Sequence, residues 1–599
     1  MFSIEQRDSD AASIVPRIFY ELDFAHAARH LVEVTMTVHD VVGNPEFVLP
    51  AWVPGSYKIR DYISRLGSLV SENADGEALS YEWSSGNRFR VEAQGADVVV
   101  VRYNYYAAEH SVRHSYVGRG RAFLNPGNFL LYVDGRTAES HGLSIASPWS
   151  TVSTPLAPLA ELATFGALNY DILVDSPIEI GDHEVVKFDV AASSHEIVLA
   201  PESGVDREWI ELVCRRVVEQ GLAFWGELPY DRYVFFLQFI PEMYGGLEHA
   251  RAQVSVFDPT KLHEKTAVVR FLSLITHEFF HTWNVKRIRP IELGPFDYER
   301  ENFTRMLWLA EGATSYFDDL LSYRTGFMTE KEYLKALARQ HIGALRNVPG
   351  RHAMSVTDSS MLAWVRLYNQ HEESINQFPS YYLKGGVIFL MLDLLIIEKS
   401  DGVSSLDEGM RAHWRRYKTD PAVGVTTDEF VAIVEEACGV PIRREFLEWL
   451  DSTGDLDVNA RLATVGLGLD DRPEKPTTIG QGFPMPRDPK RRIGVSVSTK
   501  DGFLRVDRVL ASSPAAAAGI GAGDLLISVN GERVTTPAEF LRRASTTPKP
   551  RIEGLNDGRF YSVDLEPENR PTWRLVERDD VDERGHRLRR IWLDGLQSA

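Results

Sequence analysis

Residues 274–283 read Leu-Ile-Thr-His-Glu-Phe-Phe-His-Thr-Trp, an apolar stretch that contains His277, Glu278 and His281. In an α-helix, residues four apart lie one turn above each other, so the two histidines point to the same side with the glutamate beside them. Two imidazoles leave a tetrahedral zinc ion needing a third protein ligand and keeping an open position for water, whose proton the glutamate can take. The stretch predicts one Zn²⁺ per chain, with Glu278 as general base. The plainer alternative is a core helix with two half-buried histidines.

A third ligand is expected at Glu311. The stretch is not that of a metzincin, because Asn284 and Arg287 stand where that class has Gly and His. Glu311 follows the apolar residues 306–310 and precedes 312–317, a segment that predicts a buried helix. A buried carboxylate without a partner is costly, and a metal ion would supply the partner. An N-cap or a pairing with a nearby arginine is the alternative.

Composition bounds the class of protein. The chain has 599 residues, 44% of them hydrophobic and 25% charged, which predicts a globular protein of several domains. A net charge of −20 argues against a nucleic-acid partner, because phosphate binding requires a basic face. Only Cys214 and Cys438 are present, so no disulfide framework is expected. No signal peptide and no run of 18 apolar residues is found, so we expect no membrane partner and a cytoplasmic location, or a periplasmic one if the sequence has been trimmed.

The hydrophobic period changes near residue 200. Residues 1–200 predict an antiparallel β-sandwich or saddle, because apolar and polar residues alternate as in half-buried strands. Residues 201–465 predict buried strands followed by helices, with helical spacing dominant after Glu330. The strands expected are Val32–Val38, Val98–Tyr106, Phe129–Val133, Tyr170–Val174, Val185–Val190, Tyr233–Ile240 and Ala252–Phe257.

Gly245, Gly246 and Glu248 lie on a strand-like segment ahead of the histidine stretch. Glycine in a strand often marks the close approach of a ligand or another backbone, so both glycines are candidates for contact with a substrate. Glu248 follows them on the same segment. Taken alone, a solvated carboxylate on an edge strand is the more ordinary reading.

Tyr382 precedes a strongly apolar helix within Ser-Tyr-Tyr-Leu-Lys-Gly-Gly, residues 380–386. A phenol at this position can donate a hydrogen bond to an oxyanion. The alternative is a core tyrosine whose hydroxyl is satisfied by the protein.

Residues 466–487 are rich in Gly and Pro and predict a linker. Residues 488–575 resemble a PDZ domain, through Ser-Pro-Ala-Ala-Ala-Ala-Gly-Ile at 513–520 and Gly-Asp-Leu-Leu-Ile-Ser-Val-Asn-Gly at 523–531, and a peptide C-terminus is its expected partner. The segment 493–496, Ile-Gly-Val-Ser, departs from the usual Gly-Leu-Gly-Phe loop. Residues 576–599 are expected to form a tail without a motif, and truncation near residue 485 is expected to leave hydrolysis of short peptides intact.

The motifs together resemble the bacterial glycyl aminopeptidases, a family related to the aminopeptidase N type of gluzincin. The resemblance rests on Trp-Val-Pro-Gly-Ser-Tyr-Lys-Ile-Arg-Asp at 52–61 and His-Glu-Phe-Phe-His-Thr-Trp-Asn-Val-Lys-Arg-Ile-Arg-Pro at 277–290. It implies a multidomain α+β fold with an N-terminal antiparallel β domain, a thermolysin-like α/β plus helical catalytic domain, and a C-terminal PDZ-like β domain.

The resemblance also implies roles for individual residues. His277, His281 and Glu311 would bind zinc, and Glu278 would be the general base. Glu248 would bind the free amine of a peptide, with a preference for N-terminal Gly or Ala, and Tyr382 would stabilise the oxyanion. The aminopeptidase N types have Gly-x-Met-Glu-Asn where residues 245–249 read Gly-Gly-Leu-Glu-His.

Three other functions share parts of this pattern. A zinc endopeptidase with PDZ-mediated substrate binding would use the same metal site without an anionic anchor for the amine. A gluzincin epoxide hydrolase would use the same ligands, and a PDZ-bearing scaffold would keep a vestigial metal site. Cleavage of free and N-acetylated peptides separates the endopeptidase from the aminopeptidase.

Overall fold

The structure is a computed structural model that describes residues 4–201, 204–470, 478–479, 483–484, 493–568 and 573–596. The chain forms two compact units. The first contains Met1–Ala310, Phe317–Met328 and Asp407–Ala437, and the second contains Glu311–Tyr316, Thr329–Leu406 and Cys438–Ala599. The predicted linker, residues 466–487, lies mostly outside the described residues.

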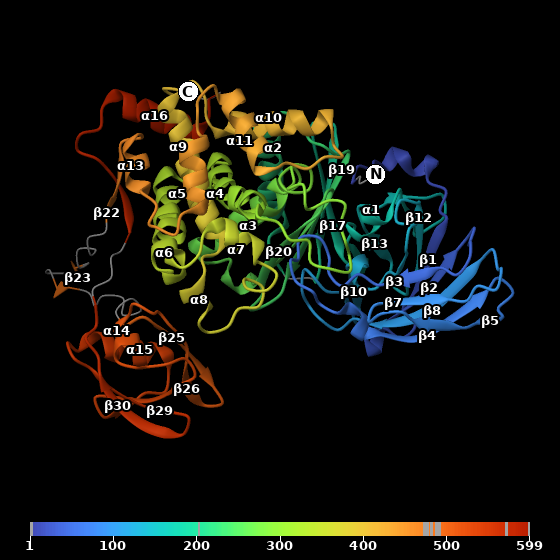
Figure 1. Cartoon of the computed structure of the whole chain (residues 1–599), viewed down its shortest axis with the longest axis horizontal. Helices are drawn as coiled ribbons and strands as arrows, with labels where there is room; N and C mark the ends of the chain where they lie inside the picture. Colours follow the sequence, from blue (N-terminus) through green and yellow to red (C-terminus); the bar gives the residue numbers. More distant parts are fainter. Residues whose placement is uncertain are drawn as a thin grey trace. The chain divides into compact units, whose positions relative to one another are not determined.

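The N-terminal region is built from β-sheets, as predicted (Figure 1). Side chains of β2 alternate between buried and half-buried positions, which places one face of its sheet on the core. Pairing within these sheets is antiparallel, except that β1 and β12 run parallel. The eight-stranded sheet has the order β14 (Ala157–Pro158), β15 (Thr164–Ala167), β12 (His141–Ala146), β1 (Ile18–Asp23), β2 (Leu31–Val38), β8 (Val99–Tyr106), β4 (Leu66–Asn73) and β5 (Ala78–Leu79).

Two four-stranded sheets complete this region. One has the order β13 (Thr151–Ser153), β16 (Ile178–Gly181), β10 (Arg121–Leu124) and β9 (Tyr116–Val117). The other has the order β11 (Tyr132–Val133), β3 (Glu46–Val48), β7 (Arg88–Val91) and β6 (Tyr81–Trp83).

Two of the predicted strands differ in the structure. Residues 170–174 form helix α1 (Tyr170–Val174) instead of a strand, because the Asn169 side chain caps it by accepting a hydrogen bond from the backbone N–H of Ile172 at 2.9 Å. Of the strand predicted at residues 129–133, only β11 forms, since a 3₁₀ turn at Pro126–Asn128 immediately precedes this segment.

A five-stranded sheet carries Gly245, Gly246 and Glu248 on its last strand, β20. Its order is β17 (Glu184–Val190), β18 (Ser193–Leu199), β19 (Arg232–Phe239), β21 (Ala252–Phe257) and β20 (Tyr244–Glu248). The sheet therefore extends across residue 200, where the sequence predicts a domain boundary. Helices α2 (Arg207–Trp225) and α3 (Lys265–Phe280) pack on each other, and α3 lies against β20 and β21.

Helices make up most of the chain between residues 308 and 463. A π-helix, η6 (Trp308–Ala313), continues directly into α4 (Thr314–Arg324). The α-helices that follow are α5 (Glu330–Ala336), α6 (Gly343–Arg346), α7 (Val356–Met361), α8 (Ser374–Gln377), α9 (Tyr381–Lys399), α10 (Leu406–Thr419), α11 (Thr427–Cys438), α12 (Arg443–Asp451) and α13 (Val458–Ala463).

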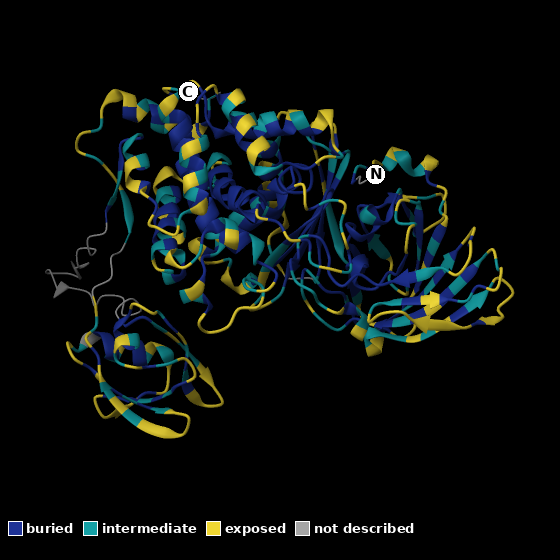
Figure 2. Cartoon of the chain, viewed as in Figure 1, coloured by how far each residue is buried: buried dark blue, intermediate teal, exposed yellow. Residues whose placement is uncertain are grey.

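Most residues of helix α9, in the second unit, are buried (Figure 2). The stretch Ser374–Lys399 is the one described helical segment long and apolar enough to cross a membrane, judged by length and composition only. Since 83% of its apolar window is buried inside the protein, it has the character of a core helix.

The PDZ-like region forms a compact β domain, as predicted. Its own core includes Ile493, Val506 and Phe540, all fully buried. The sheet runs through β25 (Val495–Lys500), β26 (Phe503–Val509), β27 (Leu525–Val529), β29 (Arg551–Asn556) and β30 (Arg559–Asp564), with β28 (Glu532–Arg533) on β27 and helices α14 (Pro514–Ala517) and α15 (Pro537–Thr546).

Candidate active site

Helix α3 presents the two histidines one turn apart, with ring centroids 4.6 Å from each other. His277 lies in the last turn of the helix and His281 caps it. Nδ1 of His277 is 2.8 Å from Oδ2 of Asp318 on α4. Because Asp318 engages Nδ1, it orients the ring with Nε2 as the nitrogen for a metal, the arrangement common in zinc sites.

Backbone contacts orient His281. Its Nδ1 lies 2.7 Å from the carbonyl oxygen of Asn284. The Asn284 side chain in turn donates to the carbonyl oxygens of Leu309 and Ala310, at 2.9 and 3.3 Å. Asn284 thereby ties the end of α3 to η6, the helix on which Glu311 lies.

Two groups of side chains have ligand atoms that all lie within 4.8 Å of one another. The first is His277, His281 and Glu311, and the second is Glu248, Glu278 and His281. The first group offers two imidazoles and a carboxylate that is only 2% exposed. This donor set, with both imidazole Nδ1 atoms engaged by protein oxygens, fits a catalytic zinc site.

Glu278 is buried against β20. A Cβ atom on Gly246 would stand 1.8 Å from Oε1 of Glu278, so only glycine leaves room for the carboxylate. Gly245 differs, because a Cβ there would meet nothing nearer than Cγ1 of Val256 at 3.9 Å. Gly246 therefore has a steric reason to be glycine that Gly245 lacks.

Glu248 ends β20 and is covered by the segment 52–61. A Cβ atom on Gly55 would lie 2.7 Å from both carboxylate oxygens of Glu248. Gly55 also has a φ of +86°, which favours glycine. The segment 52–61 therefore lies directly on this carboxylate, and Glu248 is 4% exposed.

A buried ion network holds the chain that follows Glu248. Oδ1 of Asp175 lies 2.6 Å from Nζ of Lys286 and 3.1 Å from Nδ1 of His249, and its Oδ2 accepts from the N–H of Ala250 at 2.8 Å. Burial alone would raise the pKa of Asp175, but the charge of Lys286 and the bond from His249 lower it to about 2. His249 thus faces Asp175, which fixes the end of β20.

Glu311 and Tyr382 lie on two helices that cross closely within the second unit. A Cβ atom on Gly312 would be 2.7 Å from Cα of Gly385, so the crossing of η6 and α9 needs glycine. Tyr382 lies in the first turn of α9, and its hydroxyl is 3.0 Å from that of Tyr368. Burial, and secondarily the charge of Glu311, raises the pKa of Tyr382 well above its ordinary value, so the phenol keeps its proton.

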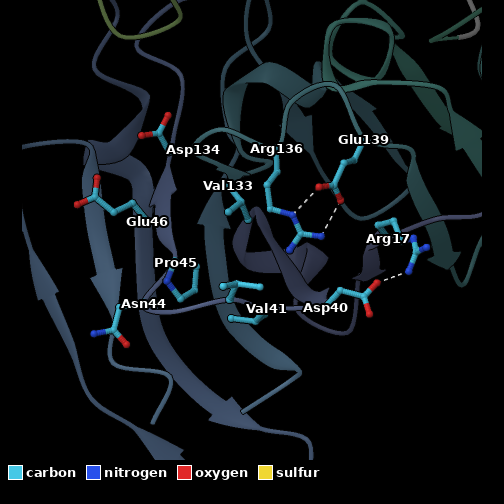
Figure 3. Close-up of a pocket in the computed structure, with 11 residues that line it drawn as sticks. Arg17, Asp40, Val41, Asn44, Pro45, Glu46, Val133, Asp134, Arg136 and Glu139 are labelled. Atoms are coloured by element: carbon cyan, nitrogen blue, oxygen red, sulfur yellow. Dashed lines mark hydrogen bonds and ion pairs between the residues drawn. The ribbon is translucent and has the colours of Figure 1, made fainter. Parts of the chain in front are cut away.

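A hollow of about 720 Å³ lies elsewhere, in the N-terminal sheets (Figure 3). Four of its charged side chains form two ion pairs within it, Arg17–Asp40 and Arg136–Glu139. None of the predicted site residues lines it. Size alone therefore does not locate the site.

Comparison with known proteins gives three family matches. Residues 19–182 match the peptidase M61 N-terminal domain, residues 270–388 match M61 glycyl aminopeptidase, and residues 505–552 match the PDZ domain. Over residues 19–182 and 270–388 the chain is therefore similar to the N-terminal and peptidase parts of the M61 glycyl aminopeptidases. The family match supports an aminopeptidase, and both histidines, Glu311 and Tyr382 fall inside the M61 peptidase match.

Solved structures include proteins similar to this chain. An aminopeptidase N family protein from Idiomarina loihiensis is 27% identical, with 96% of this chain and 100% of that chain covered and a TM-score of 0.86. An M1 zinc metallopeptidase from Deinococcus radiodurans is 15% identical over 74% of this chain and 95% of its own, with a TM-score of 0.44. None of the curated proteins matches.

The structure adds residues to the candidate site that the sequence did not point to. Asp318 lies on α4, and nothing in its local sequence pattern marks it as the partner of His277. Tyr368 and Asp175 are equally unmarked. Gly55 carries a usable signal, because the Pro-Gly turn at 54–55 predicts a positive φ, but its contact with Glu248 is long-range.

Proposed function

We propose that this chain is a zinc-dependent aminopeptidase that removes the N-terminal residue, preferably Gly or Ala, from peptides. The family match supports the aminopeptidase class. The proposal that the enzyme acts on free N-termini is supported by a second buried carboxylate beside Glu278. Glu248 forms one buried group with Glu278 and His281, and Gly55 covers Glu248.

His277, His281 and Glu311 would hold the zinc ion. When bound, zinc supplies Lewis-acid polarisation of the scissile carbonyl and lowers the pKa of water to about 7. Asp318 and the Asn284 carbonyl orient the imidazoles through Nδ1.

Glu278 would take the proton of the attacking water and deliver it to the leaving amine. Its carboxylate is fixed between α3 and Gly246, which limits its movement. Tyr382, which keeps its proton, would donate a hydrogen bond to the developing oxyanion. If the Tyr368 hydroxyl, 3.0 Å away, donates to that of Tyr382, the Tyr382 proton is left for the oxyanion.

Glu248 would bind the substrate ammonium and so fix one residue between the amine and the scissile bond. Hydrogen bonds to charged groups contribute about 1.5–3 kcal/mol. Loss of such a bond corresponds to roughly 10- to 150-fold in kcat/KM. The turn at Gly55 covers Glu248 closely, which favours a small N-terminal side chain.

The test is a panel of Gly, Ala, Leu and Lys peptides with free and N-acetylated termini, run on wild type and Glu248→Gln. We expect cleavage of the free set only, with Gly and Ala preferred, and a loss of about 10- to 150-fold for Glu248→Gln. An unchanged profile in Glu248→Gln would remove the amine anchor. Efficient cleavage of the acetylated set would favour the endopeptidase, in which the PDZ domain binds the substrate.

A further inference from the structure

The chain returns to the helical part of the second unit after the PDZ domain. Strand β31 (Arg574–Glu577) pairs antiparallel with β22 (Leu467–Asp470), from Leu467 opposite Glu577 to Asp470 opposite Arg574. Nη2 of Arg574 donates to Oδ2 of Asp470 at 2.6 Å. The two connections of the PDZ domain therefore leave from adjacent strands, and the domain is an insertion rather than a C-terminal appendage.

The last helix, α16 (Glu583–Asp594), belongs to the core of that unit. It packs on α9, and its Leu588 and Trp592 are fully buried. Arg589 donates from Nε to the carbonyl oxygen of Val465 and from Nη2 to that of Gly466, at 2.9 and 3.0 Å. Figure 1 shows α16 next to α9.

A chain of buried hydrogen bonds links this helix to the segment that carries Glu311. Nε1 of Trp592 donates to the Tyr316 hydroxyl at 2.9 Å, and that hydroxyl donates to Oδ2 of Asp393 at 2.5 Å. Asp393 is anchored further, because its Oδ1 accepts from the N–H of Leu406 at 2.8 Å. Tyr316 stands just over one turn after Glu311, and Asp393 lies on α9.

The continuous helix formed by η6 and α4 therefore meets α9 at two places. The two cross at Gly312 and Gly385, beside Glu311 and Tyr382, and they are joined again through Tyr316 on α4 and Asp393 on α9. Trp592 donates to the second junction. Without that donor the buried Tyr316 hydroxyl loses one fixed partner, which loosens the helix on which Glu311 is held.

We propose that Trp592 and Tyr316 are positioning residues for Glu311, so that the helix beyond the PDZ domain completes the metal site. This inference rests on the proposed role of Glu311 as a zinc ligand. The residues that orient metal ligands typically account for about 10- to 100-fold in metal affinity. Trp592 and Tyr316 affect zinc affinity by holding the helix that carries Glu311.

The experiment uses the full chain with Trp592→Phe and Tyr316→Phe, which keep the rings and remove one hydrogen-bonding group each. Arg590→Ala is the control, because Arg590 is exposed on the same helix. The zinc dissociation constant is measured by chelator competition, and Tm is measured for the metal-free and zinc-loaded proteins. We expect zinc affinity to fall about tenfold or more in both variants, a smaller rise in Tm on loading, and wild-type values for Arg590→Ala.

A merely structural role would give a different result. Tm would then fall by the same amount with and without zinc while the dissociation constant stayed within twofold of wild type, and this outcome would overturn the proposal. Glu311→Ala, measured in parallel, separates the two assignments. If it binds zinc like wild type, both the ligand and the positioning role fail; if it loses zinc while Trp592→Phe and Tyr316→Phe do not, only the positioning role fails.

Discussion

Replacement of Gly246 by alanine should disable the general base without removing the metal. The added Cβ would stand 1.8 Å from Oε1 and 2.3 Å from Cδ of Glu278. Since real Cβ atoms essentially never approach another heavy atom within 3.0 Å, the carboxylate must move by about 1.2 Å. A misplacement of about 1 Å in a reacting group can cost 100-fold in rate. We therefore expect kcat of Gly246→Ala to fall about 100-fold.

The assay is steady-state hydrolysis of alanine p-nitroanilide, with zinc content measured on the same preparations. Gly245→Ala is the matched variant, because its Cβ would meet only Cγ1 of Val256, at 3.9 Å. We expect its kcat to stay within about threefold of wild type, since contact at that distance is ordinary van der Waals packing. Any effect of Gly245→Ala should appear in KM, through the predicted contact with substrate.

Two results would refute this reasoning. One is a Gly246→Ala protein with full zinc and wild-type kcat, which would mean that Glu278 is not the base or is free to move. The other is an equal loss in both alanine variants, which would point to damage to strand β20 rather than to the Glu278 contact.

Four further predictions concern side chains of the site. Glu278→Gln should lower turnover at least about 100-fold with zinc near one per chain, and either zinc loss or a near-normal rate would contradict this. Glu311→Ala should lose zinc while Glu301→Ala keeps it, as measured by metal analysis; equal zinc in the two would exclude Glu311 as a ligand. Asp318→Asn should weaken zinc binding about 10- to 100-fold, and an unchanged chelator titration would count against its role on His277. The pKa of Asp175 is lowered from 3.8 to about 2, so its carboxylate stabilises the fold above about pH 4 and this stabilisation is lost as the pH falls through 2; the difference in Tm between wild type and Asp175→Asn should shrink over that range, and a constant difference would refute it.

Local patterns in the sequence predicted the helices on which several candidate residues lie. The helical spacing of His277 and His281 and the apolar run around Glu311 place these residues on α3 and η6. Strand β21 matches its predicted bounds, because continuous apolar runs identify buried strands. These features depend on neighbours in sequence, which periodicity reports directly.

Long-range contacts could not be predicted in this way. The cover of Glu248 by Gly55 and the bond between His277 and Asp318 join segments whose local patterns carry no sign of each other. Helix α1 was wrongly predicted as a strand because its residues are β-formers, and the Asn169 cap outweighs that preference.

The C-terminal residues give the largest revision. The sequence predicts that residues 488–575 form a separable domain followed by a tail, so that truncation near residue 485 would be tolerated. Such a truncation would also remove β31 and α16, whose Trp592 donates to Tyr316 in the core. We expect it to impair the peptidase, because it removes these core contacts. The sequence did not reveal them, since a mixed, charge-rich pattern hides the buried face of α16.

Aminopeptidase activity is tested most directly by the mass of the products that the wild-type protein releases from one heptapeptide that begins with glycine, supplied with a free and with an acetylated N-terminus. We expect release of free glycine and the matching hexapeptide from the first substrate, and no cleavage of the second. Internal fragments from both substrates, formed at similar rates, would contradict it.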